Sequence, residues 1–345
     1  MTETEQKSHG STFPQLKAPF PSRISPHAAQ AEAGVLAWAR RFGLMTSEAA
    51  VRRFEGVHAG DLAARTYSTA GPAELQLVTD WLGWMFLFDD QGDEGERGRD
   101  PRKWATLMAP FHAVLADTHV MAQRTPSLAL ALADLLNRSE EGMPQSWCAR
   151  LRRHVRTYID SYEDEAANRA QQTPPTLAQY IPHRRASGAM YIVYDLAESV
   201  VNAEVPLELY QSREYQDLLV AAIDAVCWQN DIASTRKEEA RGDVHNLVIV
   251  LRAAIKCSLQ EAVERAVDMT NVRMAGYVES RRLMDHLLAA GGFSPGCQEE
   301  VRCCLGSYED WMRGHIEWWS YTARYTDIVH TEPGTAPEYI EPLLT

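Results

Sequence analysis

The chain has 345 residues, of which 45% are hydrophobic and 23% are charged, a composition typical of a globular protein and not of a disordered one. Its formal net charge is −13, and it lacks the excess of basic residues that nucleic-acid binding requires. The six cysteines form no CxxC pair, which indicates reduced thiols in a cytosolic protein and not a disulfide framework.

The first 26 residues are expected to form an irregular segment, because they are rich in proline and serine. Their polar start has no apolar core, so we expect no secretory signal. No stretch approaches the roughly 18 charge-free apolar residues that a membrane span needs, and the best candidate, residues 81–88, is far too short. These features predict a soluble, cytoplasmic protein with no membrane span.

After this segment, apolar residues recur almost everywhere at the spacing of a helix. Short connections that carry Gly or Pro separate the periodic stretches. No alternating β-branched run and no Gly-rich phosphate loop occurs, which excludes a Rossmann unit and a P-loop. The pattern predicts an all-α protein with one helical domain over residues 27–326 and a polar tail over 327–345. The predicted helices cover residues 28–42, 73–90, 103–122, 127–138, 145–170, 176–202, 207–237, 244–254, 258–288 and 296–325.

The helix expected over residues 73–90 ends in an acidic motif, in which Asp89, Asp90, Asp93 and Glu94 fall within six residues. If the helix continues, Asp89 and Asp93 are neighbours on one face. Crowded carboxylates repel one another without a cation, and Mg²⁺ binds one or two carboxylates together with waters and substrate phosphates. A solvated acidic helix end is the alternative interpretation. The aromatic residues that precede the motif favour a metal site, and they are Trp81, Trp84, Phe86 and Phe88.

A second polar motif follows in the helix expected over residues 207–237. Asn230, Ser234 and Glu238 recur at every fourth position, so they drift only about 40° per step and span about 12 Å of one helix face. An amide, a hydroxyl and a carboxylate form an oxygen-only set that suits a hard cation. An exposed polar face is the alternative, but residues 218–228 are almost wholly apolar, which predicts a buried helix whose polar groups need partners.

Together, the Asp-Asp-x-x-Asp/Glu and Asn-Asp-x-x-Ser-x-x-x-Glu motifs resemble those of the class I terpene synthases, specifically the bacterial terpene cyclases. The resemblance extends to Arg184, which stands forty-odd residues before Asn230, as the diphosphate-sensing arginine does in that family. It also includes the pair Arg324-Tyr325 near the C-terminus, and it covers roughly residues 17–326. It implies a single helical bundle around a central pocket.

The resemblance also assigns residues to the metal and to the diphosphate. Asp89 is implied to bind two of three Mg²⁺ ions, with Asp90, Asp93 and Glu94 completing the cluster or pairing with arginines. Which of Asp93 and Glu94 matters more stays open. The third ion is implied to be held by Asn230, Ser234 and Glu238. The donors to the diphosphate are implied to be Arg184, Lys237, Arg324 and Tyr325, and arginine suits this role because its planar fork grips phosphate oxygens.

Further residues are implied to act on the hydrocarbon part of the substrate. Ser187 and Gly188 take the family's linker and effector positions, where glycine lets a buried helix open and expose a carbonyl, although it can equally be a packing feature. Phe86, Trp311 and Trp318 are candidates to stabilise a carbocation through their ring faces, a contribution of roughly 0.5–2 kcal/mol each. A purely structural role in the core is the alternative for each ring.

The resemblance therefore implies a Mg²⁺-dependent cyclase of a linear isoprenyl diphosphate, most often farnesyl diphosphate in this family, that makes a sesquiterpene hydrocarbon or alcohol. Geranyl and geranylgeranyl diphosphate remain open as substrates, as does a helical protein that binds diphosphates without turnover. Metal-free cyclases carry Asp-x-Asp-Asp, and Leu87 stands where that motif needs aspartate. A homodimer is common in the family, and we expect no nucleic-acid partner.

Overall fold

All regular secondary structure that the structure describes is helical, and the described part contains no strand. The structure is a computed structural model that describes residues 15–95, 100–119, 125–326 and 336–345. The helices are α1 (Ala28–Arg41), α2 (Glu48–Glu55), α3 (Ala59–Thr66), α4 (Pro72–Asp93), α5 (Pro101–Ala116), α6 (Ser127–Glu140), α7 (Gln145–Gln171), α8 (Leu177–Ser187), α9 (Met190–Val200), α10 (Leu207–Tyr210), α11 (Arg213–Arg241), α12 (Leu247–Ile255), α13 (Leu259–Ala290), α14 (Pro295–Trp319) and α15 (Ala323–Thr326). The predicted all-α bundle is confirmed.

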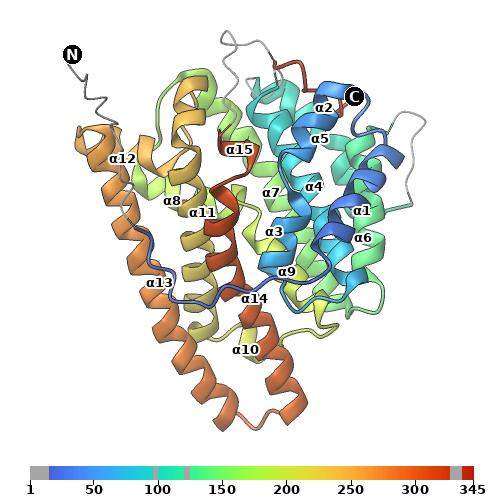
Figure 1. Ribbon diagram of the computed structural model, residues 1–345, viewed down its shortest axis with the longest axis vertical. Helices are drawn as coiled ribbons and strands as arrows, with labels where there is room; N and C mark the ends of the chain where they lie inside the picture. The colour runs from blue at the N-terminus through green and yellow to red at the C-terminus, as the bar shows by residue number, and fades with distance from the viewer. Residues whose placement is uncertain (1–14, 96–99, 120–124, 327–335) are drawn as a thin grey trace, which may run out of the picture.

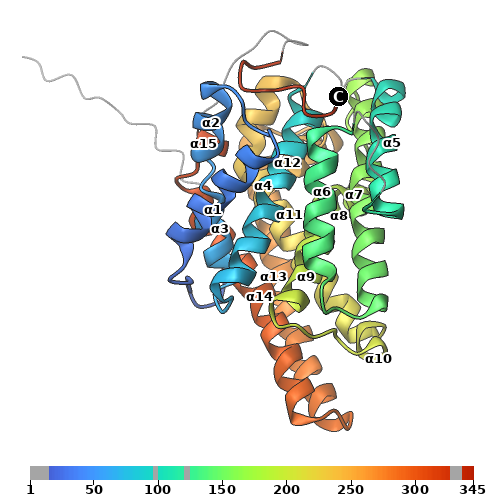
Figure 2. The ribbon, with the colours of Figure 1, turned by 90° about the vertical axis from the view of Figure 1, so that its right-hand side faces the viewer.

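Two central helices, α4 and α11, are surrounded by the others (Figures 1 and 2). α4 packs against α1, α3 and α6, and α11 lies along α13 and contacts α14. Both are apolar on nearly every side over their middle turns, where Trp81, Trp84 and Phe88 of α4 and Ile223 of α11 are almost fully buried. Helices that are hydrophobic all round belong in the core of a large domain, which explains the central position of both.

The predicted helices differ from the structure in several places, and the one expected over residues 207–237 is α10 and α11. The single helix expected over residues 176–202 is two helices, α8 and α9, separated by Gly188 and Ala189. The helix expected over 296–325 ends at Trp319, and α15 follows as one separate turn. α2 and α3 were not expected at all, because eight residues give too few apolar positions for a clear helical period. The Ser47 side chain caps the start of α2 by accepting a hydrogen bond from the backbone of Ala50.

Both end segments lie against the bundle. Residues 15–26 contain no helix and cross the outside of α13 and α14 in Figure 1, where the backbone N–H of Lys17 donates to Asn271 and Arg23 pairs with Asp310. At the other end, residues 336–345 bury Leu343 and Leu344 in the core. The part of the expected polar tail that is described therefore packs on the domain.

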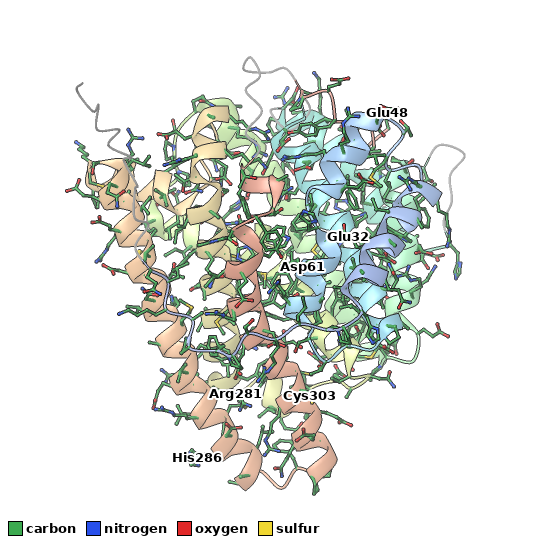
Figure 3. All side chains as sticks on the ribbon, viewed as in Figure 1. Glu32, Glu48, Asp61, Arg281, His286 and Cys303 are labelled. Atoms are coloured by element: carbon green, nitrogen blue, oxygen red, sulfur yellow. The ribbon has the colours of Figure 1, made fainter. Side chains whose placement is uncertain are left out.

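The C-terminal half of α13 and the N-terminal half of α14 project beyond the rest of the domain as a helical hairpin (Figure 2). Figure 3 places His286 near its tip, among exposed polar side chains. Within the described ranges, none of the helices has the length and apolar character of a membrane span.

Candidate active site

A cavity with an empty volume of about 1020 Å³, which includes its open mouth, lies between α4, α7, the α8–α9 break, α11 and α14. It has acidic and basic side chains on some walls and aromatic and aliphatic side chains on others. Most of the predicted site residues meet here although they come from five helices. Those that line the cavity are Phe86, Asp89, Asp93, Arg184, Ser187, Gly188, Asn230, Ser234, Lys237, Glu238, Trp311, Trp318, Arg324 and Tyr325.

On the α4 wall, Asp89 and Asp93 face the cavity one turn apart. Oδ1 of Asp89 accepts a hydrogen bond from the Tyr162 hydroxyl at 2.7 Å, and its Oδ2 pairs with Arg324. Asp93 pairs with Arg169 at 2.9 Å. Burial, reinforced by the charge of Asp89, raises the pKa of Asp93 well above its usual value. The carboxyl groups of Asp89 and Asp93 therefore disfavour each other's charged form, and a bound cation would remove this penalty.

The other two carboxylates of the acidic motif do not line the cavity. Asp90 turns away from it and accepts from Arg324 at 2.9 Å. Glu94 is fully shielded from solvent and pairs with Lys237 at 2.8 Å and with Arg241. Although burial opposes ionisation, these two cations lower the pKa of Glu94 below its ordinary value. Both residues were expected either to complete the metal cluster or to pair with arginines, and the structure shows them paired with basic side chains.

On the α11 wall, Asn230, Ser234 and Glu238 share one face, as their spacing predicts. The Asn230 amide is held from two sides: its Oδ1 accepts from Arg184 at 2.8 Å, and its Nδ2 donates to Tyr325 at 2.6 Å. Glu238 differs, because its buried Oε2 has no hydrogen-bond partner among the described residues. Burial, with the nearby charges of Asp243 and Asp231, raises the pKa of Glu238 to about 8.

These two walls fit a divalent cation. Carboxylate, amide and hydroxyl oxygens face the same cavity from α4 and α11, and Glu238 presents a buried oxygen that has no hydrogen-bond partner among the described residues. Unsatisfied buried polar atoms are rare and need an explanation, and an oxygen-only donor set suits a hard cation such as Mg²⁺.

Arg184, and not its neighbour Arg185, lines the cavity. Asp231 holds the Arg184 guanidinium at 2.9 Å, and the Tyr180 hydroxyl donates to the same carboxylate. Arg185 points elsewhere and binds Asp224 through two hydrogen bonds of 2.6 and 2.8 Å. Sequence reasoning did not assign a role to Asp231, although it lies within the second motif.

The chain opens between α8 and α9 beside the cavity. Ala189 adopts a left-handed conformation with φ of 59°, which ends one helix and starts the next. A Cβ on Gly188 would overlap the Cys227 sulfur and lie 2.9 Å from the carbonyl oxygen of Arg184. Glycine is therefore required here for close packing against α11, and the buried Ser187 hydroxyl beside it has no partner among the described residues.

Aromatic rings form the apolar part of the lining. Phe86 stacks on Trp318 with centroids 5.7 Å apart and ring planes at 15°, and the Arg324 guanidinium lies 4.7 Å from the Phe86 centroid. Trp311 meets Tyr67 edge to face. The indole N–H of Trp318 donates to the carbonyl of Val57, so this ring is fixed in place.

Several lining residues were missed by sequence reasoning. His315 is buried, and its pKa falls to about 3 because burial disfavours the imidazolium. Tyr158, Tyr162 and Glu165 project from α7 at positions one turn apart, a spacing that could have identified a second polar face. The missed residues of the lining include Tyr158, Tyr162, Glu165, Asp243, His245 and His315.

The comparisons with known proteins all indicate the same family. The model of terpene synthase family 2, C-terminal metal binding, matches residues 80–275. The chain is 37% identical over 315 residues to (+)-T-muurolol synthase ((2E,6E)-farnesyl diphosphate cyclizing) of Roseiflexus castenholzii, covering 90% of this chain and 93% of that protein. It is 36% identical to pentalenene synthase of Streptomyces arenae, covering 94% and 96%.

Solved structures show the same similarity. The linalool/nerolidol synthase from Streptomyces clavuligerus superposes with a TM-score of 0.80 at 28% identity, covering 88% of this chain and 100% of that one. The same enzyme in complex with 2-fluorogeranyl diphosphate gives a TM-score of 0.78 at 26% identity, covering 89% and 98%.

Proposed function

This chain belongs to the bacterial class I terpene synthases, lyases that act on prenyl diphosphates, and from that premise we propose that it is a Mg²⁺-dependent cyclase of farnesyl diphosphate. The product is a sesquiterpene hydrocarbon or alcohol, and diphosphate is released.

One observation carries this proposal: a single cavity has carboxylates on two facing helices, basic side chains beside them and aromatic rings along its apolar lining. The two polar walls suit a metal–diphosphate group, and the apolar lining suits a hydrocarbon chain. A cavity for a small polar substrate would not need three large aromatic rings.

The residues that would hold the metal are Asp89 and Asp93 on α4 and Asn230, Ser234 and Glu238 on α11. Bound Mg²⁺ would neutralise the charge that develops on the departing diphosphate. Three ions are proposed from the family resemblance, whereas the family comparison supports metal binding in general.

The basic side chains would bind the diphosphate oxygens. Arg184, Lys237 and Arg324 already lie at the cavity, each paired with a carboxylate, namely Asp231, Glu94 and Asp89. These pairs hold the cations in place before the substrate arrives, so less conformational entropy is lost on binding. Tyr325 would donate its hydroxyl from beside Asn230.

Ionisation breaks the carbon–oxygen bond, and both electrons leave with the diphosphate oxygen. The allylic cation that remains faces Phe86, Trp311 and Trp318, whose ring faces attract positive charge without acting as nucleophiles. The α8–α9 break offers the Ser187 hydroxyl and the backbone at Gly188 beside the same cavity. These groups would orient the cation, and the closely packed lining would keep water from it.

The length of the substrate is proposed from the relatives. One relative, of whose length the match covers 93%, is named for cyclising (2E,6E)-farnesyl diphosphate. A geranyl substrate is the second candidate, because a related structure holds 2-fluorogeranyl diphosphate.

The test is incubation of the purified protein with geranyl, farnesyl and geranylgeranyl diphosphate, with Mg²⁺ or with EDTA, and gas chromatography of a hexane extract. We expect a Mg²⁺-dependent sesquiterpene from farnesyl diphosphate and none from Asp89→Asn or Asn230→Ala. A product from another substrate would correct the chain length. Tight binding of all three without turnover would support the diphosphate-binding alternative.

A further inference from the structure

A second cluster of metal-binding side chains lies beside the carboxylate walls. It consists of Glu165 from α7, His183 from α8 and His245 from the connection between α11 and α12. One ligand atom from each residue lies within 4.8 Å of the others. Glu165 Oε1 is 3.1 Å from His183 Nε2, and the two imidazole rings are 5.0 Å apart.

His245 is the member of this cluster that most needs a ligand. Only 8% of it is exposed, and neither of its ring nitrogens has a hydrogen-bond partner among the described residues. Its backbone N–H donates to Asp243, which fixes the ring beside Glu165 and His183. A buried imidazole with both nitrogens unsatisfied is costly unless something fills the gap.

The charge around the cluster also favours a cation. Arg169 contacts Glu165, Asp93 and Asp243 at 3.4, 2.9 and 3.1 Å. Three carboxyl groups share this one arginine, an arrangement that a bound cation would stabilise. Burial lowers the pKa of His245, so its neutral form, which is the form that binds metals, is favoured.

We propose that Glu165, His183 and His245 form a binding site for a borderline transition-metal ion such as Zn²⁺, distinct from the carboxylate walls that would hold Mg²⁺. The site goes beyond the proposed cyclase function and does not depend on it. Two imidazoles and one carboxylate suit Zn²⁺, whereas Mg²⁺ prefers oxygen donors alone. Zinc–ligand bonds of about 2.0–2.2 Å place tetrahedral donors roughly 3.4 Å apart. Glu165 and His183 already lie near this separation, so the ion requires only a small approach of His245.

An ion bound at this position would stabilise the structure around it. It would join α7, α8 and the α11–α12 connection at the edge of the cavity. His183 directly precedes Arg184, and Glu165 lies next to Arg169, the partner of Asp93. An ion here would therefore fix two segments that carry residues of the proposed active site.

The experiment measures metal bound to tag-free protein after dialysis against EDTA, addition of Zn²⁺ and gel filtration in millimolar Mg²⁺. Elemental analysis is expected to find about one Zn²⁺ per chain, since the described residues contain one such three-ligand cluster. His245→Gln and His183→Gln are expected to lose it. His286→Gln is the matched control, because that histidine is exposed on α13 (Figure 3), and Asn230→Ala is expected to retain the ion because it alters only the proposed Mg²⁺ site.

Several results would overturn the proposal. Wild-type protein without bound Zn²⁺ would do so, as would Zn²⁺ that His245→Gln and His183→Gln both retain. Zn²⁺ that Asn230→Ala loses, or that Mg²⁺ displaces, would instead be an ion at the carboxylate walls.

Cobalt substitution decides the matter if the histidine variants fail to fold. Co²⁺ bound to wild-type protein by nitrogen and oxygen donors gives visible bands without the intense thiolate charge-transfer absorption. That absorption would place the ion at cysteines and contradict the assignment. The zinc-binding experiment measures no turnover. A protein that binds Zn²⁺ but gives no product in the substrate incubation would therefore contradict the proposed cyclase function and leave the zinc site standing.

Discussion

The Asp89 carboxylate is oriented by neighbours from two other helices. The Tyr162 hydroxyl on α7 donates to Oδ1, and Arg324 on α15 pairs with Oδ2. Tyr162 lies this close to α4 because residue 92 is glycine, and a Cβ there would overlap the tyrosine ring. The orientation of this proposed metal ligand thus depends on a residue that no metal motif contains.

Tyr162→Phe is expected to weaken metal binding. Loss of a hydrogen bond to a charged group costs about 1.5–3 kcal/mol, so the Mg²⁺ concentration for half-maximal turnover should rise about tenfold or more. A metal titration of the initial rate measures this. Tyr158→Phe is the matched control, since its hydroxyl contacts Tyr162 and the Met85 carbonyl but not Asp89. An equal effect in both variants would indicate a packing role.

Two adjacent arginines give a second prediction at the scale of single residues. Arg184→Ala should lower kcat/KM by at least about a hundredfold, since it removes a charged donor from the reacting group. Arg185→Ala should leave activity within a few-fold of wild type, because its partner Asp224 keeps a second arginine, Arg273, at 2.9 Å. Steady-state rates with farnesyl diphosphate measure both. The reverse order would move the diphosphate contact to Arg185.

Helical spacing predicted that the motif residues of α11 share one face and that Asp89 and Asp93 lie side by side on α4, because residues four apart share a helix face. It failed for Asp90 and Glu94, which project about 100° away from Asp89 and Asp93. Two of their partners, Arg324 and Tyr339, are more than two hundred residues away in the chain. Only the tertiary structure brings such partners together, so the sequence alone left the roles of these carboxylates open.

At the scale of helices, the α8–α9 break and α11 approach closely enough to exclude a side chain. The resemblance predicted that the chain opens at Gly188, whereas the left-handed residue is Ala189. Gly188 is needed for a different reason, namely its contact with Cys227 of α11. This contact positions the Ser187–Gly188 segment against the helix that carries Asn230.

Gly188→Ala is expected to lower the free energy of unfolding by about 1–3 kcal/mol, as overpacking does. The same change in a Cys227→Ala background should cost at least about 0.5 kcal/mol less, because the overlapping sulfur is gone and directly contacting residues couple. Urea denaturation of the four proteins measures the coupling. Equal costs in the two backgrounds would show that the overlap with the Arg184 carbonyl dominates.

A buried charge network joins α7 to α9 and to the segment that follows α9. Arg150 pairs with Asp195 at 2.9 Å, with Glu198 at 2.6 Å and with Glu204 at 3.5 Å. Burial raises the pKa of Glu198 from 4.5 to about 8, because one arginine does not offset its desolvation and the charge of Asp195.

The folded state consequently binds a proton at Glu198 that the unfolded state releases. Its contribution to stability is complete below pH 4.5 and is lost as the pH rises through 8, with a slope of up to about 1.4 kcal/mol per pH unit. Urea midpoints from pH 5.5 to 9 should therefore fall less in Glu198→Gln than in wild type. Glu204→Gln should keep the wild-type slope, and an unchanged slope in Glu198→Gln would contradict the assignment.

At the scale of the whole molecule, the C-terminal residues join elements that lie far apart in the chain. The Tyr339 hydroxyl donates to Glu94 at 2.5 Å, and its ring lies against the Arg53 guanidinium of α2. The Glu341 carboxylate accepts from the backbone N–H groups of Thr46 and Ser47 at the start of α2, where a helix dipole favours negative charge.

The helical architecture was predictable because apolar periodicity extends over most of the chain. The packing of residues 336–345 was not, since ten residues containing two prolines show no periodicity and reveal their apolar face only against the bundle.

Removal of the buried leucines tests whether this segment contributes to global stability. Leu343→Ala with Leu344→Ala should lower the free energy of unfolding by at least about 3 kcal/mol, since each buried Leu→Ala change costs about 2–5 kcal/mol when neighbours cannot fill the space. Leu207→Ala is the matched control, because Leu207 is 60% exposed and should change stability by less than about 0.5 kcal/mol. Chemical denaturation followed by helical circular dichroism measures both. If the double variant matches the control, the segment lies on the domain without stabilising it. A loss of stability with unchanged turnover at low temperature would separate its structural contribution from the active site.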